Sequence, residues 1–190
     1  MSDPDPISIS SSKESLIDIS IKSSNWTSVD FNVHEHCKKI MEAVVSNVLG
    51  KGYENKSIEV SLLLADDENL HNLNKEFRNK DDATNVLSFP FYKIQKNNIK
   101  NVLNLNSYLF LGDIAISFER VMNESLEQEK TFIEYFSHIL IHGLLHLFGY
   151  DHISDEEAKI MEKLEIKIMN SVGYKYKPIE FDDQIVSQNF

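Results

Sequence analysis

The chain has 190 residues, of which 42% are hydrophobic and 26% charged, a composition typical of a single globular domain with a real core. Its net charge of −11 argues against broad, nonspecific polyanion binding, so a nucleic-acid ligand would need a local basic patch. The acidic first residues and the lack of an apolar run of about 18 residues lead us to expect no signal peptide and no membrane span. With a single Cys37, no intramolecular disulfide can form, and we expect a cytoplasmic protein with no DNA or membrane partner.

Composition divides the chain into three parts. Residues 1–13 are rich in serine, with two Asp-Pro steps, and we expect them to be disordered. Residues 14–176 are expected to form one domain. Residues 177–190 form an acidic tail that we expect to be peripheral.

Strands are predicted mostly in the first two thirds of the chain, and the longest helical patterns come late. In chain order we expect a strand at 17–21, a helix at 33–49, a strand at 57–65 and a helix from the cap at 66–67 to 77. We then expect a polar turn at 79–82, a strand at 86–89, a flexible loop or irregular hairpin at 93–107, and a strand at 108–118 interrupted by Gly112 and Asp113. The last two elements are a helix at 126–148 and a helix capped by Ser154 and Glu157 that ends before Gly173. This order favours an α+β fold in which helices cover a small mixed sheet of about four strands. The order of the strands in the sheet cannot be read from the sequence.

Three histidines near residue 150 have the spacing of a metal site. His142 and His146 are four residues apart, so on a helix both imidazoles can point at one ion. Gly149 can then end the helix with a left-handed turn, which allows His152 to swing back as the third ligand. Three neutral imidazoles and an open position for water describe a catalytic zinc site.

The other histidines have less specific interpretations. His34 and His36 are two apart and do not face each other on a helix, so we interpret them as surface residues, and Cys37 as a buried apolar residue. His138 cannot share an ion with His146, because eight helical residues span about 12 Å. We expect His138 to support the ligands from behind or simply to pack.

Two neighbours of the histidines bear on the chemistry. Asp151 could orient a ligand imidazole through a hydrogen bond, or it could be an ordinary turn residue. The spacing of the histidines matches that of metzincin proteases, but Gly143 stands where those enzymes have the glutamate that acts as general base. Peptide hydrolysis by that mechanism is therefore not expected, although a zincin-like geometry could survive.

The chain resembles the YbeY family of bacterial endoribonucleases, which act in ribosomal RNA maturation. The resemblance is carried by four segments in the family's order: Leu73-Asn74-x-x-Phe77-Arg78, Thr84-Asn85-Val86-Leu87-Ser88-Phe89-Pro90, Leu111-Gly112-Asp113-Ile114, and His142-Gly143-Leu144-Leu145-His146-Leu147-Phe148-Gly149-Tyr150-Asp151-His152. The residues after the last segment, through Tyr174, also resemble the last helix of the family. The resemblance covers residues 57 to 174.

This resemblance implies a zincin-like α+β fold and one Zn²⁺ ion on His142, His146 and His152. It implies that Arg78 is the basic catalytic residue beside His142, where it would hold a phosphate by two hydrogen bonds, with Lys75 and Lys80 completing a basic spot. The family commonly has aspartate where this chain has Asn85. An amide cannot act as a base, so we expect Asn85 to contribute at most a hydrogen bond behind the ligands.

The resulting hypothesis is a zinc-dependent, single-strand-specific endoribonuclease that acts on ribosomal RNA, in 16S rRNA 3′-end maturation and ribosome quality control, in association with the small ribosomal subunit. The residues alone indicate metal-assisted hydrolysis of a phosphodiester or another polarised ester. The alternative is a ribosome-associated assembly factor whose metal is mainly structural, because an acidic surface suits protein partners better than bare RNA.

Overall fold

The structure is a computed structural model that describes residues 16–51, 56–94, 98–105 and 107–175. The segments expected to be disordered or peripheral, 1–13 and 177–190, lie outside the described residues. No helix in these described ranges is long and apolar enough to cross a membrane.

Four strands form one mixed sheet at the centre of the described chain. The strands are β1 (Leu16–Ile21), β2 (Ser57–Ala65), β3 (Val86–Pro90) and β4 (Tyr108–Ser117), and their order in the sheet is β1-β2-β4-β3. β1, β2 and β4 are parallel, whereas β3 runs antiparallel to β4 and forms an edge of the sheet. The expectation of a small mixed sheet of about four strands is confirmed.

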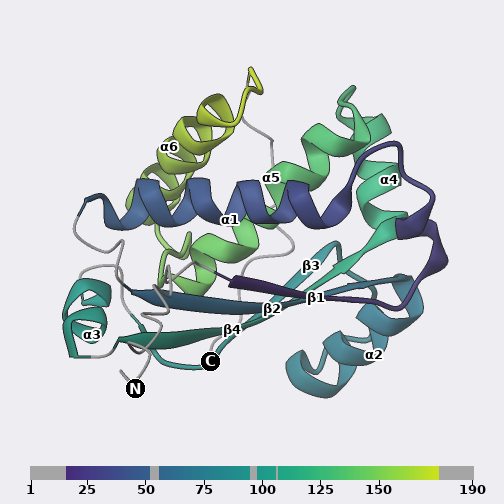
Figure 1. Cartoon of the computed structure of the whole chain (residues 1–190). Coiled ribbons are helices and arrows are strands. Elements are labelled where there is room, and N and C mark those ends of the chain that lie inside the picture. The colour runs from purple at the N-terminus through teal and green to yellow at the C-terminus, as the bar shows by residue number, and fades with distance from the viewer. Residues whose placement is uncertain (1–15, 52–55, 95–97, 106, 176–190) are drawn as a thin grey trace, which may run out of the picture.

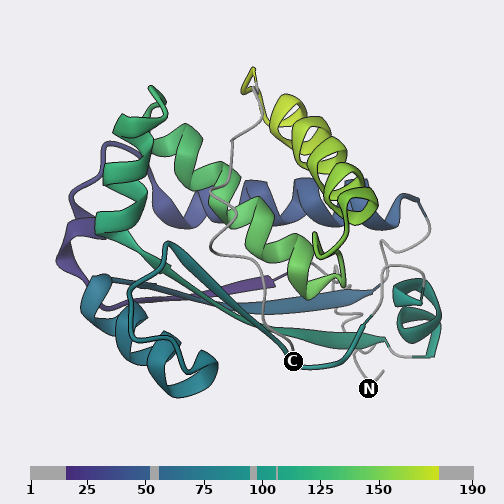
Figure 2. The same cartoon turned by 180° about the vertical axis from the view of Figure 1, so that it is seen from behind.

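Helices cover both faces of this sheet unequally (Figures 1 and 2). On one face lie α1 (Val33–Leu49), α4 (Phe118–Glu127), α5 (Phe132–Leu147) and α6 (Asp155–Ser171). On the other face lies α2 (Asp67–Arg78), while the short α3 (Ile99–Leu105) lies at one end of the sheet and a 3₁₀ turn (Ser24–Thr27) follows β1. The architecture is the zincin-like α+β fold that the sequence predicted, with the candidate metal residues on a late helix.

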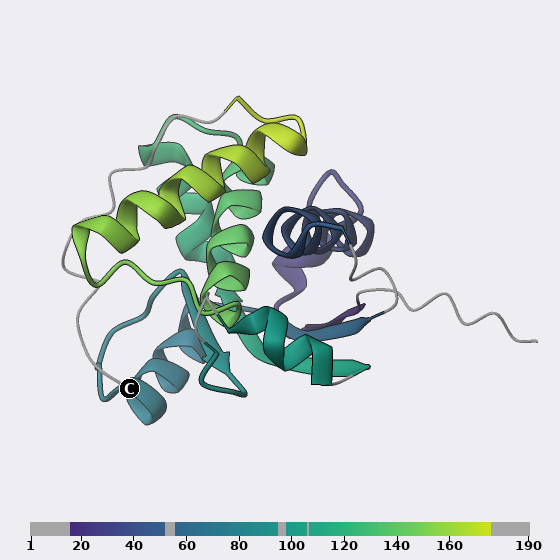
Figure 3. The same ribbon diagram turned by 90° about the vertical axis from the view of Figure 1, so that its left-hand side faces the viewer.

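Helix α5 is the central helix of the larger layer. It contacts α1, α4 and α6 as well as β3 and β4, and Figure 3 shows it between the sheet and α6. This explains why its sequence is apolar on almost every side: Phe136, Ile139, Leu140, Ile141 and Leu144 are all completely buried. A helix that is hydrophobic all round is a buried helix. Its polar exceptions, the histidines, are therefore held in a rigid setting.

The helix predicted at 126–148 corresponds to α5 but was predicted to start too early, and α4 was not predicted. α4 begins directly after β4, where the Ser117 hydroxyl accepts a hydrogen bond from the Arg120 amide at 3.4 Å, and it ends at Glu127. Glu129 then takes a left-handed φ of 53°, and Thr131 caps the start of α5 by accepting a hydrogen bond from the Glu134 amide. Thr131 with Glu134 three residues later was a readable start signal.

Two further expectations between residues 93 and 118 are also corrected. The segment predicted as a loop or hairpin contains α3, which is held by Ile99, a residue that is 2% exposed. β4 is continuous across Gly112 and Asp113, and a bulge opposite Glu59 and Val60 absorbs the irregularity. A bulge keeps a strand in its sheet while it changes the local register, which a reading of alternation alone cannot see.

The interpretation of His36 as a surface residue is wrong. His36 lies on α1 and is half-buried, and its Nε2 is 2.7 Å from the Ser137 hydroxyl on α5. That hydroxyl donates to the Ile133 carbonyl, so it accepts from the Nε2–H of His36. His34 is exposed and Cys37 is buried, as predicted.

Candidate metal centre

The last turn of α5 and the loop after it bring the three histidines together. α5 ends at Leu147, and Gly149 adopts a left-handed φ of 82° with its amide donating to the His146 carbonyl at 2.9 Å. The predicted glycine turn is therefore confirmed. It reverses the chain so that His152, on the loop between α5 and α6, returns to the side chains of His142 and His146.

The geometry of the three imidazoles fits a single ion. One nitrogen from each of His142, His146 and His152 lies within 4.8 Å of the others, and the Nε2 atoms of His142 and His146 are 3.0 Å apart. Nitrogens bound to one tetrahedral zinc at about 2.0–2.1 Å lie about 3.4 Å apart. Among the residues that the structure describes, this is the cluster that could hold a metal ion.

Hydrogen bonds at the opposite ring nitrogens decide which atoms face the ion. The Nδ1 of His142 is 2.7 Å from a carboxylate oxygen of Glu165, and the Nδ1 of His146 is 3.0 Å from the Tyr150 carbonyl oxygen. Both partners can only accept, so each Nδ1 carries the proton. Each Nε2 then presents a lone pair. Two lone pairs 3.0 Å apart repel each other unless a cation lies between them, so the donor set fits a metal ion.

Burial favours the neutral form of His146 and His152, which metal ligation requires. The pKa of His146 lies well below its usual range, first because the ring is buried and then because His142 and His152 are close. Burial also lowers the pKa of His152, and His142 lowers it further. Neutral rings leave their nitrogen lone pairs available at neutral pH.

Glu165 on α6 is a site residue for which the sequence analysis assigned no role. It is 3% exposed, and its two carboxylate oxygens lie 2.7 Å from Nδ1 of His142 and 3.4 Å from Nε2 of His138. Burial raises the pKa of the Glu165 carboxyl, but the hydrogen bonds from the two histidines outweigh this and hold the pKa well below its usual range. The sequence carried one signal: a glutamate on the face of α6 that buries Met161 and Ile168.

His138 thus lies behind the ligands and is completely buried, with Glu165 between it and His142. Asp151 does not make the direct contact with a ligand ring that was considered for it. Its carboxylate accepts from the His152 amide at 2.9 Å and is 4.0 Å from the Nδ1 of His146, to which the Tyr150 carbonyl is closer.

Arg78 links the end of α2 to the edge strand β3. It is the last residue of α2, and its guanidinium donates to the Ser88 carbonyl of β3 at 2.9 Å. Burial lowers the pKa of Arg78, and the charge of Asp151 opposes that shift. Since Asp151 directly precedes His152, the guanidinium lies within electrostatic reach of the loop that carries His152.

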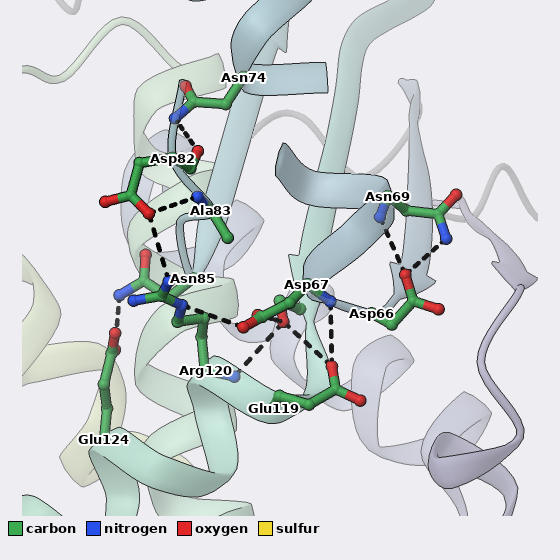
Figure 4. Close-up of polar contacts among 11 residues, drawn as sticks. Asp66, Asp67, Asn69, Asn74, Asp82, Ala83, Asn85, Glu119, Arg120 and Glu124 are labelled. Atoms are coloured by element: carbon green, nitrogen blue, oxygen red, sulfur yellow. Dashed lines mark hydrogen bonds and ion pairs between the residues drawn. The ribbon is translucent and has the colours of Figure 1, made fainter. Parts of the chain in front are cut away.

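The basic spot expected around Arg78 is partly neutralised. Lys75 makes an ion pair with Asp81, with contacts of 3.0 and 3.1 Å to its two carboxylate oxygens. The side-chain hydrogen bond of Asn85 goes to Glu124 of α4 at 2.8 Å, not to a ligand histidine (Figure 4). Glu124 also accepts from the Tyr135 hydroxyl.

Gly143 has a structural reason for standing where the proteases have glutamate. A Cβ atom at Gly143 would lie 3.1 Å from the Ser88 hydroxyl and 3.2 and 3.3 Å from methyl groups of Val86 and Ile114. The Ser88 hydroxyl donates to the Gly143 carbonyl at 3.1 Å. α5 therefore packs on β3 and β4 at a distance that leaves no room for a long side chain.

Comparisons with known proteins identify the family of the chain. A family profile described as endoribonuclease YbeY matches residues 21–173. Proteins named endoribonuclease YbeY from Agrobacterium fabrum and Sinorhizobium fredii are 39% and 37% identical over 160 residues, which is 83% of this chain and 90% and 88% of theirs. A solution structure from Thermotoga maritima shares the fold with a TM-score of 0.50 and 23% identity, over 83% of this chain and 91% of the other. The chain therefore belongs to the endoribonuclease YbeY family.

Proposed function

We propose that this protein is a zinc-dependent, single-strand-specific endoribonuclease that hydrolyses phosphodiester bonds of ribosomal RNA. Membership of the endoribonuclease YbeY family supports the reaction class. The proposal extends to 16S rRNA 3′-end maturation and ribosome quality control in association with the small ribosomal subunit, as the family resemblance implies.

The observation that carries the proposal is the convergence of three imidazole nitrogens, with the tautomers of His142 and His146 fixed from behind. His142, His146 and His152 would hold the ion. Zinc bound there supplies a Lewis acid that polarises a phosphoryl oxygen or acidifies water. Glu165 and the Tyr150 carbonyl keep the two helical rings aimed at a single point.

Arg78 is the residue of this chain suited to the phosphate. A guanidinium has five N–H donors, and the Ser88 carbonyl takes one of them, which anchors the side chain beside β3. From this position Arg78 would neutralise negative charge that develops on the phosphoryl oxygens. Asp151 helps to keep the guanidinium charged in its half-buried setting.

The test is a cleavage assay on a single-stranded RNA and on the same RNA annealed to its complement. The zinc-loaded protein is compared with Arg78→Ala, His146→Ala and, as a control, Lys163→Ala, an exposed cation on α6. We expect cleavage of the single strand, a loss of about 10²- to 10³-fold in kcat for Arg78→Ala, and no effect in the control. Equal cleavage by all four proteins would mean that the activity comes from elsewhere.

The alternative role as an assembly factor with a structural metal has one observation in its favour, the net charge of −11, which suits protein partners. It predicts that His146→Ala lowers the melting temperature while the folded protein still cofractionates with small ribosomal subunits. The endonuclease proposal predicts instead that Arg78→Ala loses cleavage without a change in melting temperature.

A further inference from the structure

Several aromatic rings lie exposed along β3 and its surroundings. Phe77 at the end of α2 is 58% exposed, and Phe91 and Tyr92 directly after β3 are 63% and 47% exposed. Phe89 on β3 and Phe110 on β4 lie beside them and are partly buried. We call these five residues the aromatic strip.

The strip consists of two ring clusters joined by one extended segment. Phe77 and Phe89 meet edge to face with centroids 5.5 Å apart, and Phe91 meets Phe110 at 5.5 Å and Tyr92 at 4.8 Å. Phe89 and Phe91 are two residues apart, and the Phe91 amide extends the β3–β4 ladder by donating to the Leu111 carbonyl at 2.8 Å. Side chains two apart on an extended strand point to the same side.

Arg78 links the strip to the candidate site at the β3 edge of the sheet. The Arg78 guanidinium lies 6.0 Å from the centre of the Phe89 ring and donates to the carbonyl of Ser88, the residue before Phe89. The Ser88 side chain points to the opposite face from Phe89, and its hydroxyl donates to the carbonyl of Gly143, which directly follows the ligand His142, so the site and the strip lie on the two sides of the edge strand. A strand of RNA that crossed the β3 edge with a phosphate at Arg78 would have its nucleotides on the α2 side over exposed rings.

Because the chain is acidic, its affinity for RNA needs a contribution other than phosphate neutralisation. Most nonspecific affinity for nucleic acid comes from Lys and Arg neutralising phosphates, but this chain has 19 basic and 30 acidic residues, and Lys75 near Arg78 is already paired with Asp81. Stacking of bases on aromatic rings does not depend on phosphate neutralisation, and it contributes about 1–3 kcal/mol per base. An acidic nuclease can bind single strands in this way.

We propose that the aromatic strip is the stacking platform on which bases of single-stranded RNA rest while the adjacent phosphate lies at Arg78. The proposal rests on the proposed function, because it takes RNA as the substrate. It also accounts for a preference for single strands, since paired bases in a duplex do not offer their faces to protein rings.

The experiment measures affinity of the full-length, zinc-loaded protein for a hydrolysis-resistant phosphorothioate RNA single strand by fluorescence anisotropy at several salt concentrations. The variants are Phe77→Ala, Phe91→Ala, Phe91→Leu and Phe91→Trp. The control is Leu126→Ala at the end of α4, which is 70% exposed and so removes a comparable apolar side chain elsewhere. Because the substituted side chains are mostly exposed, melting temperatures should stay within a few degrees of the wild type.

We expect the two alanine variants to bind on the order of 5- to 150-fold more weakly. Phe91→Leu should lose nearly as much as Phe91→Ala, whereas Phe91→Trp and Leu126→Ala should bind like the wild type. With Arg78 as the main phosphate contact, the slope of log K against log salt should be shallow, about −0.7.

If the wild-type protein binds and cleaves RNA and the alanine variants bind it equally well, the stacking role of the aromatic strip is refuted. The proposed function then still stands. Full rescue by Phe91→Leu would refute the stacking role as well, because an apolar contact would then suffice without a ring. Wild-type protein that neither binds nor cleaves single-stranded RNA would instead reject the proposed function, on which the strip depends. A change of the alanine variants in sedimentation, with RNA affinity intact, would assign the rings to contacts between copies of the chain.

Discussion

Replacement of Glu165 by glutamine is expected to weaken zinc binding while leaving the fold intact. In the wild type, a buried carboxylate accepts the Nδ1 proton of His142 at 2.7 Å and lies beside His138. Glutamine has almost the same shape and can still accept that hydrogen bond, but it carries no negative charge. The variant therefore isolates the electrostatic part of the contact, which makes the His142 ring a better donor to the metal.

The size of the effect follows from how closely Glu165 is coupled to the ligand. Partners that hydrogen-bond to metal-bound histidines contribute about 10- to 100-fold in metal affinity, which corresponds to about 1.4–2.8 kcal/mol. Glu165 is 3% exposed, so little solvent screens its charge, and we expect the upper half of that range. Glu165→Ala should lose still more, because it also removes the acceptor from a buried N–H group.

The assay is a competition for Zn²⁺ against a chromophoric chelator at pH 7.5, with circular dichroism of the metal-free proteins to verify the fold. Glu156→Gln is the matched control, since it removes an exposed carboxylate from the first turn of the same helix. A dissociation constant for folded Glu165→Gln within about twofold of the wild type would refute the reasoning. It would show that the negative charge of Glu165 does not contribute to zinc binding.

Two predictions concern stability. Gly112→Ala should cost more than about 3 kcal/mol of unfolding free energy in urea denaturation, because a Cβ atom there would lie 2.2 Å from the Phe89 carbonyl oxygen. Gly173→Ala, also at a positive φ but with no atom near its Cβ position, should cost about 1 kcal/mol, and equal losses would contradict the clash. Burial, and then the charge of Lys39, lower the pKa of His36 from 6.5 to about 4, so between these values the unfolded chain binds a proton that the folded chain does not. The free energy of unfolding should therefore fall as pH drops from 6.5 to 4, by about 1–2 kcal/mol after discounting for the partly exposed ring. The drop should be smaller by that amount in His36→Gln, and identical pH profiles would contradict the assignment.

Features that depend on neighbouring residues were predictable from the sequence. The spacing of His142 and His146 and the turn at Gly149 lie within one short segment, so helical geometry suffices to bring His152 back. The capping box of Ser154 and Glu157 is equally local, and the structure shows both of its hydrogen bonds. The helix boundary between α4 and α5 was also marked locally, by the polar run 127–131 and the cap at Thr131. The predicted helix nevertheless ran across that polar run, so the miss lay in the interpretation and not in a missing signal.

Other features of the site depend on how distant segments pack. Glu165 reaches His142 because α6 crosses α5, and Arg78 comes within electrostatic reach of Asp151 because α2 ends beside the edge strand β3. Neither the crossing of two helices nor the order of strands in a sheet is encoded in residue spacing. By itself, the sequence thus determined which side chains could bind the metal. Only the tertiary structure decided which carboxylate supports them and which rings surround the site, because burial and contact between distant segments arise when the core assembles.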